Sequence, residues 1–577
     1  MTDRINGLAA APGLARGPAL RWEQQPLTIP VYTPADLSAE RTRLAGARRT
    51  AAEQLRQLSR QIEAGVGEAE AALFEAQAMF LEDATLIQRA EDEIAKGQNA
   101  EIAWHEACEF FAAMLESMPD ETLSARSADI RDIDRRVIET LTGSRATVIL
   151  VEPVVILAHD LLPSQTALLD RSKVLAFCTA EGGRTSHTAI LAKALGIPAV
   201  VGLGEAVLRV QNDTVLLVDG NEGWVVADPD PEAILEFDQL ARAAAEQRSR
   251  DKALAEEPAM TRDGHRVEIV ANVGSVEDTR LALQYGAEGI GLLRTEFLFL
   301  NRGQAPDEQT QYAAYRTILE LMGSRPAVVR TLDIGGDKDV PYFDFGAEAN
   351  PFLGYRAVRI SLDHPKEFKV QLRALLRAGV GHDLRIMFPM IATLDEVRAV
   401  KRLTAEARDS LLNEGQEAAG TIQVGIMVEV PSVVLMVERF AREVDFFSVG
   451  TNDLTQYIFA AERGNARVAQ FSDPCHPAVL RAIRQVVEGA HQAGIWVGVC
   501  GEMGGDPQAI PILLGLGVDE LSITPLQIPS AKQIVRQWSL AEARDLAARA
   551  LELDDASAVR NLARLNTSTS STSKSVV

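Results

Sequence analysis

Eight short apolar segments recur through the C-terminal half of the chain, with enough residues between consecutive segments for a helix. They are rich in β-branched residues and have the length of buried strands. Eight alternations of strand and helix over roughly 300 residues predict a (β/α)8 barrel, with a doubly wound sheet as the structural alternative. The predicted strands cover residues 267–272, 289–294, 327–333, 384–389, 424–429, 445–450, 496–500 and 520–523.

Polar side chains stand at the C-terminal end of nearly every predicted strand. Enzymes with a (β/α)8 barrel build their sites from these ends of several strands, so the pattern favours the barrel over the doubly wound sheet. The residues concerned are Asn272, Arg294, Thr295, Glu296, Arg330, Asp333, Glu429, Asn452, Asp453, Cys500 and Glu502.

The chemical types of these residues indicate a site for an anionic substrate. Arg294 and Arg330 carry forked donors that match phosphate and carboxylate groups. Glu429 and Asp453 form a candidate metal pair, because Mg²⁺ is commonly held by one or two carboxylates and by substrate oxygens. Cys500 ends its strand where a thiol can act as an acid. Taken singly, each residue has a structural explanation, but their joint appearance at successive strand ends favours a site.

A glycine-rich segment precedes the barrel at residues 182–187, with the sequence Gly-Gly-Arg-Thr-Ser-His. It lies between predicted strands at 174–179 and 197–201, and Thr185 or Ser186 can cap a helix over 189–195. His187 would then lie in the first helical turn, where free N–H groups favour phosphate and an imidazole can accept a phosphoryl group. A capping histidine in a tight turn is the alternative for such a residue taken alone.

The segment 182–193 resembles the phosphohistidine loop shared by enzyme I of the bacterial phosphoenolpyruvate–sugar phosphotransferase system, pyruvate phosphate dikinase and phosphoenolpyruvate synthase. Segments 291–299, 330–338, 350–356 and 449–457 resemble enzyme I in particular. The resemblance runs from residue 6 to about residue 560, so the chain is identified as a member of the enzyme I family.

The resemblance implies a multidomain α/β protein. The expected parts are a swivelling α/β phosphohistidine domain (1–33 and 144–229), an inserted helical phosphocarrier-binding domain (34–143), a linker helix (230–259), a (β/α)8 barrel for phosphoenolpyruvate binding and dimerisation (260–565) and a disordered tail (566–577).

The resemblance also implies an activity. Phosphoenolpyruvate would phosphorylate His187 with release of pyruvate, and the phosphoryl group would pass to a histidine of a small phosphocarrier protein, as the first step of sugar uptake. Cys500 would be the proton donor, Mg²⁺ would be held by Glu429 and Asp453, and the protein would be a homodimer. The implied substrate-binding residues are Arg294, Arg330, Arg356, Asn452, Asp453 and Arg463.

The region 34–143 has apolar residues at steps of three and four and is expected to form about four helices. Between residues 63 and 93 it has nine acidic residues and one basic residue, Arg89. Such a surface suits electrostatic docking of the phosphocarrier, although a solvated helix face is the alternative. The candidate docking residues are Met79, Phe80, Glu82 and Asp83.

Two rival functions are less consistent with the sequence. A dikinase or phosphoenolpyruvate synthase needs a large nucleotide-binding domain, whereas the residues before 144 are predicted to form a short strand and helices. A non-catalytic phosphoenolpyruvate sensor would lack the nucleophile or the acid, yet His187 and Cys500 are both present.

Composition and net charge limit the classes of binding partner and the cellular compartment that we expect for this chain. The chain has 577 residues and a net charge of −23, which argues against nucleic acid and anionic membranes as partners. Its four cysteines are scattered without metal-ligand spacing, and no apolar run has the length of a membrane span. The start of the chain lacks the features of a signal peptide, so a cytoplasmic location is expected.

Overall fold

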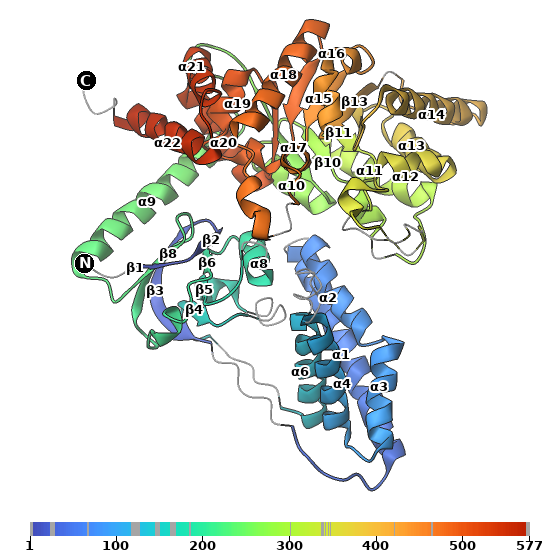
Figure 1. Cartoon of the computed structure of the whole chain (residues 1–577), viewed down its shortest axis with the longest axis vertical. Helices are drawn as coiled ribbons and strands as arrows, with labels where there is room; N and C mark the ends of the chain where they lie inside the picture. Colours follow the sequence, from blue (N-terminus) through green and yellow to red (C-terminus); the bar gives the residue numbers. More distant parts are fainter. Residues whose placement is uncertain are drawn as a thin grey trace. The chain divides into compact units, whose positions relative to one another are not determined.

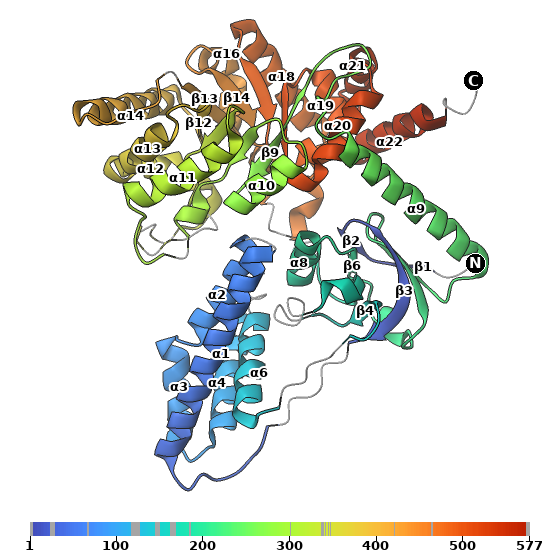
Figure 2. The same cartoon turned by 180° about the vertical axis from the view of Figure 1, so that it is seen from behind.

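The computed structural model forms two compact units, residues 1–245 and 246–577, and each is described by itself (Figures 1 and 2). The division falls within the long helix α9 (Pro231–Ala253). The structure describes residues 4–22, 29–65, 68–116, 127–144, 150–161, 169–183, 186–300, 302–335, 340, 342–343, 346, 348–420, 422–462 and 466–572.

The first unit contains a mixed sheet with the strand order β1-β8-β7-β3-β4-β5-β6-β2. Its strands are β1 (Arg4–Asn6), β2 (Leu8–Ala11), β3 (Leu14–Arg21), β4 (Val154–Ala158), β5 (Val174–Thr179), β6 (Ala199–Val201), β7 (Val215–Asp219) and β8 (Trp224–Ala227). Short 3-10 helices lie at Arg171–Lys173 and Val207–Arg209. Helix α8 (His187–Leu195) connects β5 to β6 and ends at Gly196, whose φ of 68° requires the left-handed conformation that glycine adopts readily.

Five described helices lie between β3 and β4 in the sequence, where about four were expected. They are α1 (Leu37–Gly65), α2 (Glu68–Phe80), α3 (Ala84–Ala95), α4 (Ala100–Glu116) and α6 (Ser127–Thr142). The additional helix arises because Asp83 accepts hydrogen bonds from the N–H groups of Thr85 and Leu86 and so begins α3. Trp104 and Phe74 are fully buried in the core that these helices share.

The second unit is a closed eight-stranded parallel barrel, which confirms the predicted fold class and excludes the doubly wound sheet. Its strands are β9 (Glu268–Val273), β10 (Ile290–Leu293), β11 (Ala327–Arg330), β12 (Leu384–Phe388), β13 (Gln423–Val428), β14 (Phe446–Val449), β15 (Trp496–Val499) and β16 (Glu520–Ile523). The last strand, β16, pairs with β9 and completes the ring.

Helices cover the outside of the barrel (Figure 1). They are α10 (Val276–Gln284), α11 (Glu308–Met322), α12 (Val358–Asp363), α13 (Pro365–Ala378), α14 (Leu394–Asn413), α15 (Pro431–Leu435), α16 (Val437–Phe440), α17 (Thr451–Phe459), α18 (Pro477–Ala493), α19 (Ile510–Leu516), α20 (Ile528–Gln537), α21 (Leu540–Ala550) and α22 (Ala556–Thr572). Short 3-10 helices are η3 (Glu296–Leu298), η4 (Pro351–Leu353), η5 (Ala466–Phe471), η6 (Glu502–Gly505) and η7 (Pro525–Gln527).

The C-terminal end of the chain differs from the expectation. Residues 566–572 were expected to be disordered, but they continue α22, because the buried Val559 and Ala563 anchor this helix and it extends beyond them. Residues 573–577 lie outside the described part. None of the helices among the described residues has both the length and the hydropathy that a membrane span requires.

Candidate active site

Buried charged side chains form a continuous network at the C-terminal ends of β10 and β11. Arg330 Nη2 donates a hydrogen bond to Glu296 Oε1 at 2.7 Å, and its Nη1 lies 3.0 Å from Asp333 Oδ2. Arg356 Nη2 donates to Asp333 Oδ1 at 3.0 Å. Burial lowers the pKa of the Arg330 guanidinium, but Glu296 and Asp333 outweigh this effect and raise the pKa above its ordinary value. Burial also lowers the pKa of Arg356, but Asp333 and Asp453 outweigh this effect and raise it, so both arginines remain charged.

Two buried carboxylates lie next to this network at the ends of β13 and β14. Glu429 is 1% exposed, and burial and then the neighbouring Asp453 raise its pKa to about 8. Asp453 Oδ2 lies 3.6 Å from Arg356 Nη2, whereas its Oδ1 is buried without a hydrogen-bond partner among the described residues. An orphaned carboxylate oxygen beside a second carboxylate fits a divalent cation with oxygen ligands.

Strained backbone accompanies these side chains. Met390, which lies beyond β12, has a φ of 57°, and its N–H donates to Glu429 Oε1 at 2.6 Å. Ala357, which follows Arg356, has a φ of 53°. Residues other than glycine rarely adopt such values, and strain of this kind clusters at functional sites.

Cys500 follows β15 and is 4% exposed. It belongs to a small apolar cluster of strand side chains, separate from the core between strands and helices, and its Sγ donates to the carbonyl of Val449 at 3.6 Å. Burial raises the pKa of the thiol to about 11. The thiol therefore keeps its proton at neutral pH, as a proton donor must.

Arg294 and Asn452 leave donors available at the same end of the barrel. Arg294 follows β10, is exposed, and makes no side-chain hydrogen bond or ion pair with another described residue. The pKa of the Arg294 guanidinium is lowered, first because surrounding protein atoms displace water from it and second because Arg330 is also positively charged. Part of the side chain nevertheless remains accessible to solvent. Asn452 Oδ1 accepts a hydrogen bond from the N–H of Glu502 at 3.3 Å, which orients the amide.

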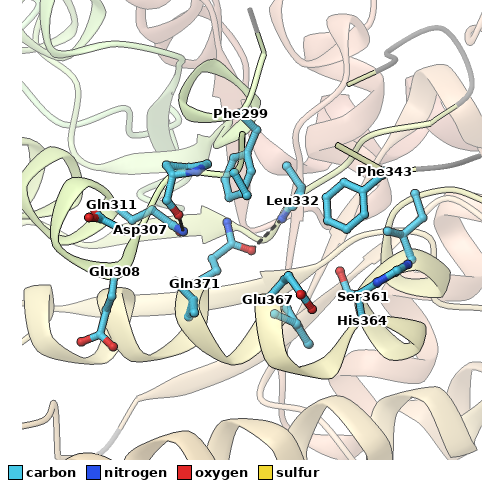
Figure 3. A pocket seen from close by; sticks show the side chains of 15 residues that line it. Phe299, Asp307, Glu308, Gln311, Leu332, Phe343, Ser361, His364, Glu367 and Gln371 are labelled. Atoms are coloured by element: carbon cyan, nitrogen blue, oxygen red, sulfur yellow. Dashed lines mark hydrogen bonds between the residues drawn. The ribbon is translucent and has the colours of Figure 1, made fainter. Parts of the chain in front are cut away.

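A layer behind the site supports its loops. Gln371 of α13 accepts a hydrogen bond from the N–H of Leu332 at 3.0 Å and donates to Thr295 Oγ1 and Tyr315 Oη, both at 3.1 Å. Figure 3 shows Gln371 pointing towards Leu332. Both residues line a cavity of about 270 Å³, together with Phe299 and Phe343. Because Leu332 lies between Arg330 and Asp333, this amide fixes the loop that carries the network.

Two predicted residues cannot be placed by their side chains. His187 lies in the first turn of α8 as expected, although the helix begins two residues before the predicted 189–195. The hydroxyl of Ser186 accepts a hydrogen bond from the N–H of Ala189 and caps the helix. The His187 side chain lies outside the described part, and so does the whole of Arg463.

The bridging role of Asp333 and the support from Gln371 were not predicted. Asp333 was visible as a strand-end acid, whereas no sequence signal marks Gln371.

The candidate docking residues have mixed environments. Met79 is 60% exposed, and Glu82 is exposed with its Oε1 2.8 Å from Arg56 Nη2. Phe80 is only partly buried and packs against the helical core, while Asp83 caps α3. Met79 and Glu82 are therefore exposed at the surface, whereas Asp83 has a structural role at the start of α3.

Comparison with known proteins places the chain in one family. Three family models match, described as PEP-utilising enzyme, N-terminal (residues 6–126), mobile domain (150–223) and PEP-binding domain (248–540). A phosphoenolpyruvate-protein phosphotransferase of Geobacillus stearothermophilus is 45% identical over 96% of this chain and 96% of its own. The protein of that name from Bacillus subtilis (strain 168) is 43% identical over 96% of this chain and 97% of its own. The chain therefore belongs to the phosphoenolpyruvate-protein phosphotransferase family of PEP-utilising enzymes.

Proposed function

We propose that this protein transfers the phosphoryl group of phosphoenolpyruvate to its own His187 and then to a histidine of a small phosphocarrier protein. Pyruvate is the other product, and the reaction is the first step of phosphotransferase-system sugar uptake. The observation that carries the proposal is the meeting, at one end of the barrel, of the arginine network, the carboxylate pair and a protonated thiol.

The arginines account for binding. Arg294 has donors for the phosphoryl group that no described residue occupies, and Arg330, held by Glu296 and Asp333, presents a fixed positive charge beside it. Asn452 and Arg463 would bind the carboxylate, while Arg356 orders the acids around it. Fixed cations stabilise the charge that spreads over the phosphoryl oxygens during transfer.

Transfer breaks the bond between phosphorus and the enolic oxygen and forms one between phosphorus and an imidazole nitrogen of His187. The electron pair of the broken bond stays with the enolate, and its terminal carbon takes the proton of Cys500 to give pyruvate. The thiolate then regains a proton from solvent. A pKa of about 11 favours this return to the protonated form.

Glu429 and Asp453 would hold Mg²⁺, in keeping with the buried Asp453 Oδ1, which has no hydrogen-bond partner in the described part of the chain. The ion would neutralise charge on the phosphoryl oxygens when it is bound. His187 must serve both the barrel and the carrier, so we propose that the α/β domain swings between them. The carrier would dock on the acidic helical insert, the barrel would form a homodimer, and the protein would act in the cytoplasm.

The test uses phosphoenolpyruvate labelled at phosphorus, with Mg²⁺ and without ATP. Acid-labile label should appear on the chain, disappear in His187→Ala, and pass to an added histidine phosphocarrier protein. His382→Ala, which changes a histidine on the barrel unit, is the matched control and should label normally. Labelling without transfer would overturn the carrier assignment, labelling only with ATP would favour a dikinase, and no labelling would overturn the phosphotransfer proposal.

A further inference from the structure

The C-terminal helix α22 reaches two loops of the barrel through one side chain, Arg560. Its Nε lies 2.6 Å from Asp473 Oδ2, and its Nη2 donates to Asp473 Oδ1 at 2.9 Å. Its Nη1 donates to Asp506 Oδ2 at 2.7 Å and to Gln508 Oε1 at 3.3 Å. Every nitrogen of the guanidinium is therefore used, and two carboxylates from separate loops share one cation.

Each carboxylate also orders the backbone of its own loop. Asp506 follows η6, the 3-10 turn that begins two residues after Cys500, and its N–H donates to the carbonyl of Met503 at 3.1 Å. Asp506 Oδ1 accepts a hydrogen bond from the N–H of Gln508 at 2.9 Å. The position of Asp506 therefore sets the end of the short segment that starts at the thiol.

The other carboxylate belongs to the loop after β14 and α17. Asp473 lies two residues beyond η5, the turn that follows Arg463 in the sequence, and its Oδ1 accepts a hydrogen bond from the N–H of Cys475 at 3.0 Å. The Asp473 carbonyl also accepts a hydrogen bond from the N–H of His476 at 3.2 Å, and the ring of His476 packs edge-on against Phe459 of α17. Asp473 therefore fixes the return of this loop into α18 and its packing against α17.

Helix α22, which carries Arg560, is firmly packed against the barrel. Val559 and Ala563, on either side of Arg560 in α22, are fully buried in the barrel core. The Arg560 side chain is 30% exposed, and its planar fork matches the Asp473 carboxylate with two parallel bonds. The matched PEP-binding domain ends at residue 540, so this helix lies beyond it.

We infer that Arg560 is a positioning residue for the reaction in the barrel, holding the segment that follows Cys500 in register with the segment that packs against α17, the helix that carries Asn452 and Asp453. The inference rests on the proposed function. Arg560 touches neither substrate nor reacting atoms in this scheme, and it acts through Asp506 and Asp473. An error of about 1 Å in the position of a reacting group can lower a rate by about 100-fold, so the loss of this link should be visible in the kinetics.

The experiment compares two reactions of the full chain. In the first, phosphoenolpyruvate with Mg²⁺ labels His187, and kcat and KM are measured. In the second, a phosphorylated histidine phosphocarrier protein labels His187 in reverse, which requires the α/β unit but not the barrel loops. Arg560→Met should lower kcat/KM for phosphoenolpyruvate by about 10- to 100-fold and leave the reverse reaction within about twofold of wild type.

Further variants separate positioning from simple stabilisation. Asp506→Asn should mainly lower kcat, because it loosens the segment of the proton donor. Asp473→Asn should mainly raise KM, because it loosens the segment that packs against α17, which carries Asn452 and Asp453. Arg560→Lys should fall between wild type and Arg560→Met, since an ammonium cannot make the paired bonds. Arg549→Met, which removes an exposed arginine paired with Asp545 on α21, is the control and should behave as wild type.

The outcomes are distinct. Equal kcat and KM in wild type and Arg560→Met would overturn the inference alone. A proportional loss of both reactions in Arg560→Met, Arg560→Lys and Asp506→Asn would also overturn it, since Arg560 would then only stabilise the folded protein. Absence of phosphoenolpyruvate labelling in wild type would overturn the proposed function and, with it, this inference.

Discussion

Asp333 Oδ1 accepts a hydrogen bond from Arg356 Nη2 at 3.0 Å, and both side chains are almost fully buried. The other oxygen of Asp333 lies 3.0 Å from Arg330 Nη1, so one carboxylate sits between two guanidinium groups. Two arginines this close would repel one another in a protein interior without such a counter-charge. Asp333 therefore makes it possible to concentrate positive charge where an anionic substrate binds.

Asp333→Asn should cost both stability and substrate affinity. Removing one partner from a buried charge network leaves the remaining charges uncompensated, so the free energy of unfolding should fall by about 3 kcal/mol. The KM for phosphoenolpyruvate should rise about tenfold or more because Arg330 and Arg356 lose their common anchor. Denaturant unfolding and steady-state kinetics measure these quantities. Asp383→Asn, which breaks the more exposed pair with Arg385, should change unfolding by less than about 1 kcal/mol.

Cys500→Ser should separate the two phosphoryl transfers. The hydroxyl of serine is a much weaker acid than a thiol, so kcat for labelling by phosphoenolpyruvate should fall by about 100-fold or more. Labelling of His187 by a phosphorylated phosphocarrier should be unchanged, because that step needs no carbon protonation. Cys108→Ser, in the helical insert, is the comparison. Normal turnover of phosphoenolpyruvate by Cys500→Ser would assign the proton to another group.

Glu429→Gln should weaken the response to Mg²⁺. An amide lacks the negative charge of a carboxylate, so the Mg²⁺ concentration that gives half the maximal rate should rise at least about tenfold. Chelation of the metal should abolish labelling by phosphoenolpyruvate in wild type, and added Mg²⁺ should restore it. Glu502→Gln, at an exposed position on the same rim, should keep the wild-type dependence. An unchanged Mg²⁺ titration for Glu429→Gln would remove Glu429 from the metal site.

Glu520→Gln should change the pH dependence of stability. Glu520 is buried on β16, its Oε1 has no partner among the described residues, and burial raises its pKa from 4.5 to about 8. A carboxyl group with a raised folded pKa costs nothing while both states are protonated, and it destabilises the fold as pH rises from about 4.5 to about 8. At pH 8 the variant should be more stable than wild type by up to about 4 kcal/mol, and at pH 4.5 the two should be nearly equal.

Denaturant unfolding at several pH values measures this difference. Glu268→Gln changes a partly exposed carboxylate on the neighbouring strand β9 and should leave the slope of wild type largely in place. A Glu520→Gln variant with the same pH slope as wild type would show that the buried carboxyl is hydrated or paired in solution.

The barrel could be predicted because each of its strands is specified by a short stretch of the sequence. Each strand is a short apolar run whose period and length are visible in the sequence, and the predicted 520–523 matches β16 at both ends. The glycine-rich segment before His187 likewise carries its own capping signal in Ser186. Local patterns of this kind fix both the type of an element and its place in the order.

The pairing within the site could not be predicted in the same way. Asp333 stands three residues from Arg330 and 23 from Arg356, and nothing in the sequence states that it lies between them. Gln371 supports the same loop from a helix and has no motif at all. Asp83 was assigned to a docking surface, although it also caps α3, because an exposed acid and a capping acid look alike in a sequence.

Closure of the barrel has a consequence for how the protein is made. Glu520 of β16 pairs with Glu268 of β9, so the first barrel strand cannot complete its pairing until a strand roughly 250 residues later has been translated. A chain cut short before β16 leaves β9 and β15 with unpaired edges, which invite aggregation and recognition by chaperones or proteases. The closed ring, and with it the substrate site, can therefore form only after the ribosome has released β16.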